Sequence, residues 1–201
     1  MRVLLILWLL SSLLATSAHS QSSDEEPLSY KEIPPAPSSF RPGNVLARMI
    51  DGLGYRFYWA TEGLRPEDLA YRPTEEARST SELIDHILSL STMVANAAEG
   101  TPNTRAARDA DTLSWSQKRE RVLSHLLRTR QQLVDKNEDE IAELRIIFRS
   151  ERGTSELPYW NIINGPLADA IYHTGQIVSF RRTSGNPMNS KVNVFEGKNR
   201  P

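Results

Sequence analysis

Apolar side chains recur at spacings of three and four residues along four segments of the chain, which is the period of one face of an α-helix. The first segment covers residues 43–62, directly after Pro42, a residue that suits the first turn of a helix. The second begins at Ser79, where Glu82 three residues later completes a capping box, and ends at Gly100. The pattern therefore predicts two amphipathic helices in the first half of the chain.

Two more helices are predicted in the second half. The third begins near Ser114, where Gln117 offers another capping box, and extends to about residue 136. The fourth begins as early as Pro158 and covers residues 167–182, with a kink expected at Gly165-Pro166. Between them, the stretch LRIIFRS fits a short extended segment. Four amphipathic helices in one domain predict an all-α fold, a four-helix bundle.

The two ends of the chain differ from the bundle in composition. Residues 1–20 contain one positive charge, an apolar run from Val3 to Leu14 and a small-x-small ending, which together predict a secretory signal peptide cleaved after Ser20. The apolar run is too short to cross about 30 Å of hydrocarbon, so cleavage is preferred to a membrane anchor. Residues 21–40 hold acidic residues, serines and prolines and are expected to form a flexible linker.

These boundaries give the expected organisation of the mature protein. The bundle occupies residues 41–184, and residues 185–201 form a C-terminal tail. We expect an exported protein, periplasmic or secreted, with no membrane association after the signal is removed. Its oligomeric state is not determined by the pattern, and a homodimer is one alternative.

Composition excludes several classes of protein. Hydrophobic residues make up 39% and charged residues 24% of the chain, as in a soluble domain with one core. The formal net charge of -1, with both signs mixed along the chain, lacks the basic stripe of a nucleic-acid-binding protein. The chain has no cysteine, so disulfides, thiolate metal sites and a protein-borne thiol nucleophile are excluded.

The four histidines differ in where the helical pattern places them. His19 belongs to the signal peptide. His125 has Arg121 and Arg128 within one turn and is expected on the solvated flank of its helix. His86 instead shares a face with apolar residues and is expected to point inward or to the edge of the core.

His173 also lies on an apolar face, and Asp169 is one turn before it. Side chains four residues apart in a helix can converge on one point, and His86 is the other histidine that is expected to point inward. Two histidines and one carboxylate suffice to hold a divalent ion in a bundle core with coordination positions left open. The alternative is an Asp–His hydrogen bond that fixes the helix, and the pattern alone leaves both interpretations open.

Three stretches of the sequence resemble the DinB family, damage-inducible four-helix bundles that are thought to be metal-dependent enzymes. They are EGLRPEDLAYRP after the first helix, RSTSELIDHILSL at the start of the second, and ADAIYHTGQIVSFRRTSGNP in the last. The resemblance covers about residues 41–190, and its specificity comes from the order and spacing of the three stretches.

The resemblance implies that His86 and His173 take the places of two of the three family ligands. Asp169 stands where a typical member has histidine. An aspartate can ligate a metal but could shift the preference toward harder ions, and a site without metal is the alternative. Zinc or nickel is the expected ion.

The function implied by the resemblance is that of a metal-dependent hydrolase or a thiol-dependent transferase acting on a small molecule. Low-molecular-weight thiols are scarce in an exported, oxidising compartment, so hydrolysis by a metal-activated water suits the signal peptide better. The alternative is a non-catalytic bundle that binds a ligand or a partner and holds no metal. Four further residues could line a pocket, although packing is the preferred role for each: Trp59, Trp160, Tyr172 and Gln176.

Overall fold

The computed structural model describes residues 28–104 and 112–201. The predicted signal peptide and the first residues of the predicted linker lie outside these ranges. Four long helices form a bundle: α1 (Pro42–Thr61), α3 (Thr80–Glu99), α4 (Trp115–Leu133) and α7 (Ala168–Thr183). The prediction of a four-helix bundle is confirmed.

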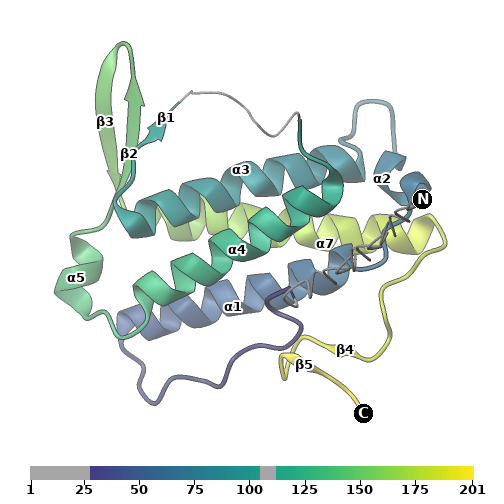
Figure 1. Ribbon diagram of the computed structural model, residues 1–201, viewed down its shortest axis with the longest axis horizontal. Coiled ribbons are helices and arrows are strands. Elements are labelled where there is room, and N and C mark those ends of the chain that lie inside the picture. Colours follow the sequence, from purple (N-terminus) through teal and green to yellow (C-terminus); the bar gives the residue numbers. More distant parts are fainter. Residues whose placement is uncertain (1–27, 105–111) are drawn as a thin grey trace, which may run out of the picture.

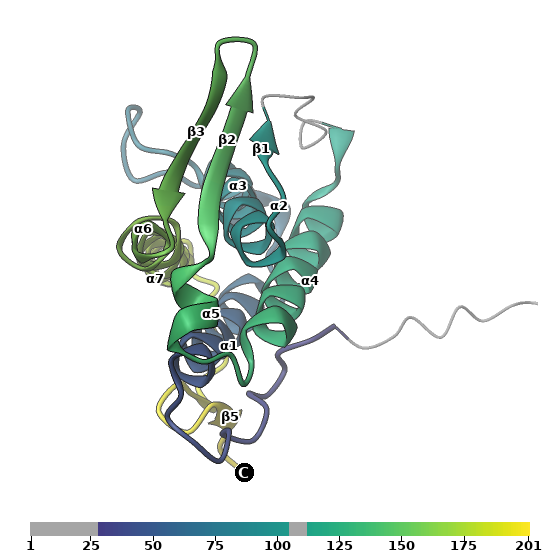
Figure 2. The same ribbon diagram turned by 90° about the vertical axis from the view of Figure 1, so that its left-hand side faces the viewer.

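The four helices lie side by side, with α1 and α3 each packed against both α4 and α7 (Figures 1 and 2). Short helices α2 (Pro66–Ala70) and α5 (Glu138–Ala142) lie in the connections between them. This arrangement places α3 directly beside α7, the two helices that carry the candidate metal ligands. Within the described ranges, no helix is both long and apolar enough to cross a membrane.

Local chemistry fixes the start of two bundle helices. At α3, Ser79 Oγ accepts from the backbone N–H of Glu82, while the Glu82 carboxylate accepts from the backbone N–H of Ser79. Ser114 and Gln117 form the same reciprocal pair at α4. Each box satisfies backbone donors that a helix start would otherwise leave unpaired, and both capping boxes predicted from the sequence are confirmed.

One continuous core runs between the four helices. Its largest fully buried side chains come from α1, α3, α4 and neighbouring segments, and include Phe57, Leu53, Ile84, Leu123, Leu126 and Ile162; α7 contributes the buried Ala170 and Ile177. Full burial of each such side chain stabilises the fold by about 1.5–3 kcal/mol. The bundle therefore has a core of its own, independent of any ion at its surface.

The last helix is interrupted where the sequence predicted a kink. Helix α6 (Trp160–Ile162) leads into a π-helical turn, η2 (Ile163–Leu167), which continues as α7. Gly165 has φ -100° and ψ -106°, outside the helical region, and Pro166 follows it inside the turn. Proline has no N–H to donate to the preceding turn, so the helical ladder is broken just before Asp169.

A small sheet projects from one end of the bundle (Figure 1). Strand β2 (Arg145–Ser150) pairs antiparallel with β3 (Gly153–Pro158) and parallel with the short β1 (Asn103–Thr104). The extended segment expected at LRIIFRS is thus confirmed as β2, and the fold is a helical bundle with a β-hairpin added to it.

The two ends of the described chain, which fall within the predicted linker and C-terminal tail, pack on α1. Tyr30 is buried on α1 against Gly54, where a Cβ would approach the ring to 2.5 Å. The C-terminal residues form a small hairpin of β4 (Val192–Asn193) and β5 (Lys198–Asn199), and Tyr55 Oη donates to Asn199 Oδ1. Contacts made by single tyrosines, Tyr30 and Tyr55, thus hold the two polar ends of the described chain against α1.

Candidate metal centre

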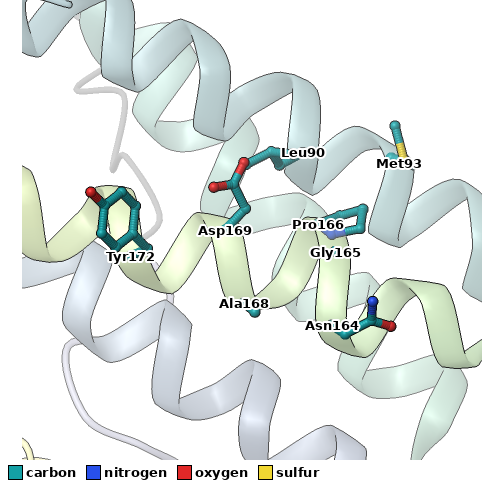
Figure 3. A pocket seen from close by; sticks show the side chains of 8 residues that line it. All are labelled: Leu90, Met93, Asn164, Gly165, Pro166, Ala168, Asp169 and Tyr172. Atoms are coloured by element: carbon teal, nitrogen blue, oxygen red, sulfur yellow. The ribbon is translucent and has the colours of Figure 1, made fainter. Parts of the chain in front are cut away.

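Three side chains from two neighbouring helices meet at the edge of the bundle. His86 projects from the second turn of α3, and Asp169 and His173 project from the first turns of α7. Asp169 points from α7 toward α3 (Figure 3). The helical break at Gly165 lies one turn before Asp169, so regular helix α7 begins directly before the two candidate ligands.

The atoms that could hold an ion lie close together. One Asp169 carboxylate oxygen is 3.0 Å from His86 Nε2, and the other is 3.2 Å from His173 Nε2. One ligand atom from each of the three residues can be chosen so that all lie within 4.8 Å of one another. The two imidazole rings are 4.8 Å apart, edge to face. The structure thus brings together His86, Asp169 and His173, which we call the His–Asp–His triad.

The triad is open to solvent on one side. The side chain of His173 is 11% exposed, that of His86 28% and that of Asp169 41%. A closed structural zinc site has four protein ligands, whereas three ligands with an accessible face leave positions for water or substrate. The exposure of the triad fits the second kind of site.

The contact on the other side of His173 favours one tautomer of its ring. Gln176 Oε1 lies 2.7 Å from His173 Nδ1, and the amide nitrogen of Gln176 donates to Tyr172 Oη at 3.4 Å. With the amide oxygen facing the ring, Nδ1 is the donor. In that neutral tautomer, Nε2 presents its lone pair toward Asp169, the arrangement in which both residues can ligate one ion.

This donor set fits a divalent ion. Imidazole and carboxylate are ordinary ligands of zinc and nickel, and a ligating histidine usually donates its second ring N–H to an acceptor such as Gln176. His86, Asp169 and His173 would hold the ion, and Gln176 would orient His173. The role of Gln176 was not predicted from the sequence, although its spacing of three residues from His173 on one helix is a usable signal.

The other residues considered from the sequence have different positions. Tyr172 lies at the triad, with its ring 5.2 Å from the His173 ring. Trp59 is buried in α1, where its indole N–H donates to the carbonyl of Lys31. Trp160 is exposed on α6. Packing is therefore the role of Trp59, while Tyr172 and Gln176 belong to the site.

The prediction that His125 lies on a solvated flank is wrong. His125 is buried between α4 and α3, and its Nδ1 is 3.1 Å from Ser91 Oγ. Burial, together with Arg128 and Arg121, lowers the pKa of His125 to about 4. The arginines one turn away suggested a surface, but the ring itself contacts hydroxyl groups of α3, which the pattern within α4 could not reveal.

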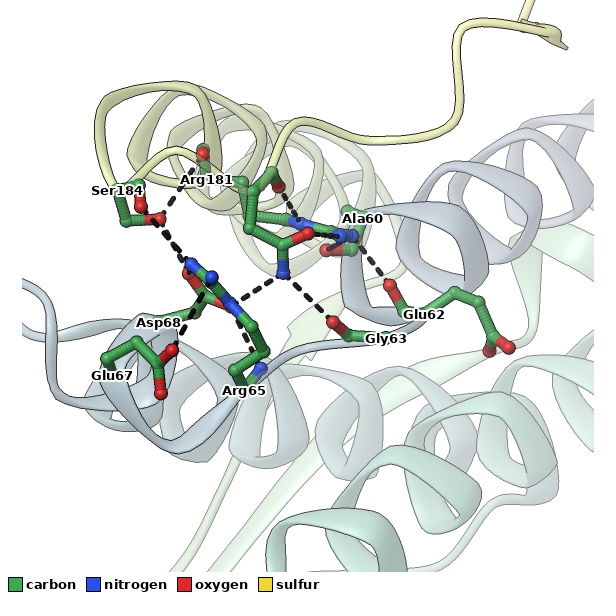
Figure 4. Close-up of polar contacts among 9 residues, drawn as sticks. Ala60, Glu62, Gly63, Arg65, Glu67, Asp68, Arg181 and Ser184 are labelled. Atoms are coloured by element: carbon green, nitrogen blue, oxygen red, sulfur yellow. Dashed lines mark hydrogen bonds and ion pairs between the residues drawn. The ribbon is translucent and has the colours of Figure 1, made fainter.

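A second polar cluster lies at the opposite end of α7 (Figure 4). The buried carboxylate of Asp68 accepts hydrogen bonds from the Arg65 side chain and backbone, from Ser184 Oγ and from the Asn186 amide. These contacts, led by that with Arg65, hold the pKa of Asp68 well below its usual range. The buried Arg181 next to it donates to three carbonyls at the end of α1: those of Trp59, Ala60 and Glu62. We call these residues the Asp68 cluster.

Comparison with known proteins defines the class of this bundle. The chain is similar to the crystal structure of a DinB-like protein, YjoA, from Bacillus subtilis, with a TM-score of 0.52 and 16% identity. The match covers 77% of this chain and 98% of that one. The fold is therefore DinB-like, as the three sequence stretches indicated. No family model matches the chain, and no curated protein matches it.

Proposed function

We propose that this chain is an exported, divalent-metal-dependent enzyme that acts on a small molecule, with hydrolysis as its reaction. The observation that carries the proposal is the convergence of three ligand atoms within 4.8 Å at a solvent-accessible edge of the bundle. The contact of His173 Nδ1 with Gln176 Oε1 supports it further, because an amide oxygen at Nδ1 favours the tautomer whose Nε2 lone pair faces the triad. A transferase that uses a thiol is the alternative within the same site.

The residues of the chain have separate tasks in this proposal. His86, Asp169 and His173 hold the ion, and Gln176 keeps the His173 ring in one orientation and one tautomer. A divalent ion held there supplies a Lewis acid that lowers the pKa of a water or thiol. The accessible face of Asp169, 41% of whose side chain is exposed, leaves room for a substrate to approach.

Metal analysis of protein purified without an affinity tag tests the proposal directly. We expect close to one zinc or nickel ion per chain, and loss of that ion in His173→Ala. Ser179→Ala, an exposed change on the same helix, is the matched control and should retain the metal. The circular dichroism spectrum should remain helical after chelation, because the core does not depend on the ion, and the melting temperature should follow metal occupancy.

A different result would favour the non-catalytic alternative. If the wild-type protein binds neither zinc nor nickel at micromolar concentrations, the triad is a hydrogen-bonded Asp–His pair with a second histidine, and the enzyme proposal fails. Export is tested separately by mass spectrometry of the secreted or periplasmic protein, which should begin near Gln21. An intact Met1 in the membrane fraction would contradict it.

A further inference from the structure

A groove of about 600 Å³ adjoins the triad and shares one residue with it, Asp169. On one side lie Leu90 and Met93 of α3, and on the other lie the π-helical turn and the first turns of α7 (Figure 3). Its size is that of pockets that bind small organic molecules. A compound that reached the triad from this direction would lie along the groove.

The groove exists because the residues that border it are small or lack a regular helical backbone. Gly165 departs from helical geometry, and no heavy atom lies within 4 Å of where its Cβ would be. Ala168, one turn before Tyr172, adds only a methyl group to the same wall. The break in the helix thus opens a space directly next to Asp169.

The lining of the groove has little charge. Leu90, Met93, Pro166 and Ala168 present apolar surface, Asn164 adds an uncharged amide, and Tyr172 stands at one end with its ring largely exposed. Asp169 is the one carboxylate among the lining residues, and no lysine or arginine is among them. A phosphate or carboxylate in the groove would therefore find no cationic side chain to bind it and would face Asp169.

We propose that this groove binds the uncharged, largely apolar part of the substrate, an aromatic ring or a short alkyl chain, while the polar reacting end of the same molecule reaches the triad. The proposal rests on the proposed function, because the triad defines which end of the molecule is polar. Tyr172 and Met93 form the contact surface for the apolar part, and Ala168 determines how large that part can be.

Three hydroxamic acids with one metal-binding group and different tails test the proposal on zinc-loaded protein. We expect benzohydroxamic acid to bind about tenfold more tightly than acetohydroxamic acid, because burial of a ring contributes at least that much. 4-Carboxybenzohydroxamic acid should lose this advantage, since its carboxylate enters a groove without a cation. Isothermal titration calorimetry measures all three affinities.

Variants of the groove test whether the benzoyl tail of the ligand binds there. Ala168→Trp fills the groove from an exposed helical position and should remove the advantage of the benzoyl tail while acetohydroxamic acid still binds. Ser179→Trp, an exposed change farther along α7, is the matched control and should preserve the advantage. Met93→Glu, which adds a charge without filling the groove, should also reduce it and covers the case in which Ala168→Trp does not fold.

The outcomes separate this proposal from the proposal of a metal enzyme. If zinc binds but the benzoyl tail gives no advantage, or the advantage persists in both Ala168→Trp and Met93→Glu, the groove proposal is overturned. If zinc does not bind, the neutral fluorophore N-phenyl-1-naphthylamine tests the groove alone. Fluorescence enhancement that is lost in Ala168→Trp and kept in Ser179→Trp would support an apolar site, and no enhancement in the wild type would contradict it.

Discussion

Helix α7 carries a polar cluster at each end, and the two clusters differ in how completely their hydrogen bonds are satisfied. In the Asp68 cluster the carboxylate accepts five hydrogen bonds, and its side chain is 1% exposed. In the His–Asp–His triad one carboxylate faces two imidazole nitrogens, and 41% of the Asp169 side chain is exposed. The first cluster has no capacity for another ligand, whereas the second has it on its accessible side.

The difference shows how one helix supports both stability and binding. Buried charges are tolerated when every polar atom is paired, and Arg181 meets this condition by donating to carbonyls at the end of α1, which otherwise lack partners. This closed arrangement joins α1, α2 and the end of α7. The triad lies at the other end, where the exposed side of Asp169 leaves a carboxylate accessible to a ligand.

The largest expected effect comes from breaking the closed cluster. Asp68→Ala leaves Arg65, Ser184 and Asn186 without their shared acceptor. Because the Arg65 side chain is 43% exposed, the cost is that of lost hydrogen bonds to a charged group, about 2–3 kcal/mol. Urea denaturation should show this loss in the free energy of unfolding, while zinc affinity of the folded fraction stays the same. A loss below about 1 kcal/mol would mean that water replaces the carboxylate and that the cluster is not closed.

His125 is a buried histidine outside the triad, and its effect on stability can be tested by changing the pH. Its pKa of about 4 in the folded protein lies below the ordinary value of about 6.5 for an unfolded chain, because burial disfavours the charged ring. Between pH 6.5 and 4 the unfolded chain therefore takes up a proton that the folded protein does not, and stability falls as pH falls. The full loss approaches about 3 kcal/mol near pH 4 and is absent above pH 7.

His125→Gln should flatten that part of the stability profile, because glutamine does not titrate and its amide can still bond to Ser91. Urea denaturation at pH 7 and at pH 4.5 measures the difference between the two proteins. Metal binding at pH 7 should not change. An unchanged slope in the variant would show that other groups cause the loss of stability in acid.

The sequence predicted most of the fold because helical periodicity and capping are local. The boxes at Ser79 and Ser114 and the break at Gly165-Pro166 depend on residues within one turn, and each appears in the structure as expected. Asp169 and His173 were likewise placed together by a spacing within one helix. The link from this pair to His86 came from the inward face of a second helix, and the resemblance to DinB proteins supported it.

Contacts between separate segments explain what the sequence did not predict. His125 is buried because Ser91 lies opposite it on α3, and Tyr30 is buried because Gly54 leaves room for its ring. The Asp68 cluster joins residues more than a hundred positions apart, such as Asp68 and Ser184. Patterns within one element do not contain this information.

A smaller effect is expected from the residue that orients His173. Gln176→Leu removes the acceptor for Nδ1 and should weaken zinc affinity about 10–100-fold, as second-sphere changes do. Gln176→Glu keeps an acceptor oxygen and should retain most of the affinity. Competition with a fluorescent zinc chelator measures both variants, and the melting temperature of the metal-free proteins should be the same. Equal zinc affinity in the leucine variant would show that Gln176 does not orient the ring.

The smallest effect is expected where the triad departs from the typical family pattern. Asp169→His would give three imidazole ligands, with residues 169 and 173 still one turn apart on α7, and nitrogen donors suit zinc and nickel better than a single carboxylate oxygen does. We therefore expect zinc to bind several-fold more tightly at neutral pH, with the preference for manganese or magnesium reduced. Asp169→Ala is the control, and it should bind zinc more weakly than the parent. If Asp169→Ala binds as well as the parent and Asp169→His binds no better, Asp169 is not a ligand. Its contacts with His86 and His173 would then be hydrogen bonds that join α3 to α7. The triad would stabilise the packing of helices, as the Asp68 cluster does at the other end of α7.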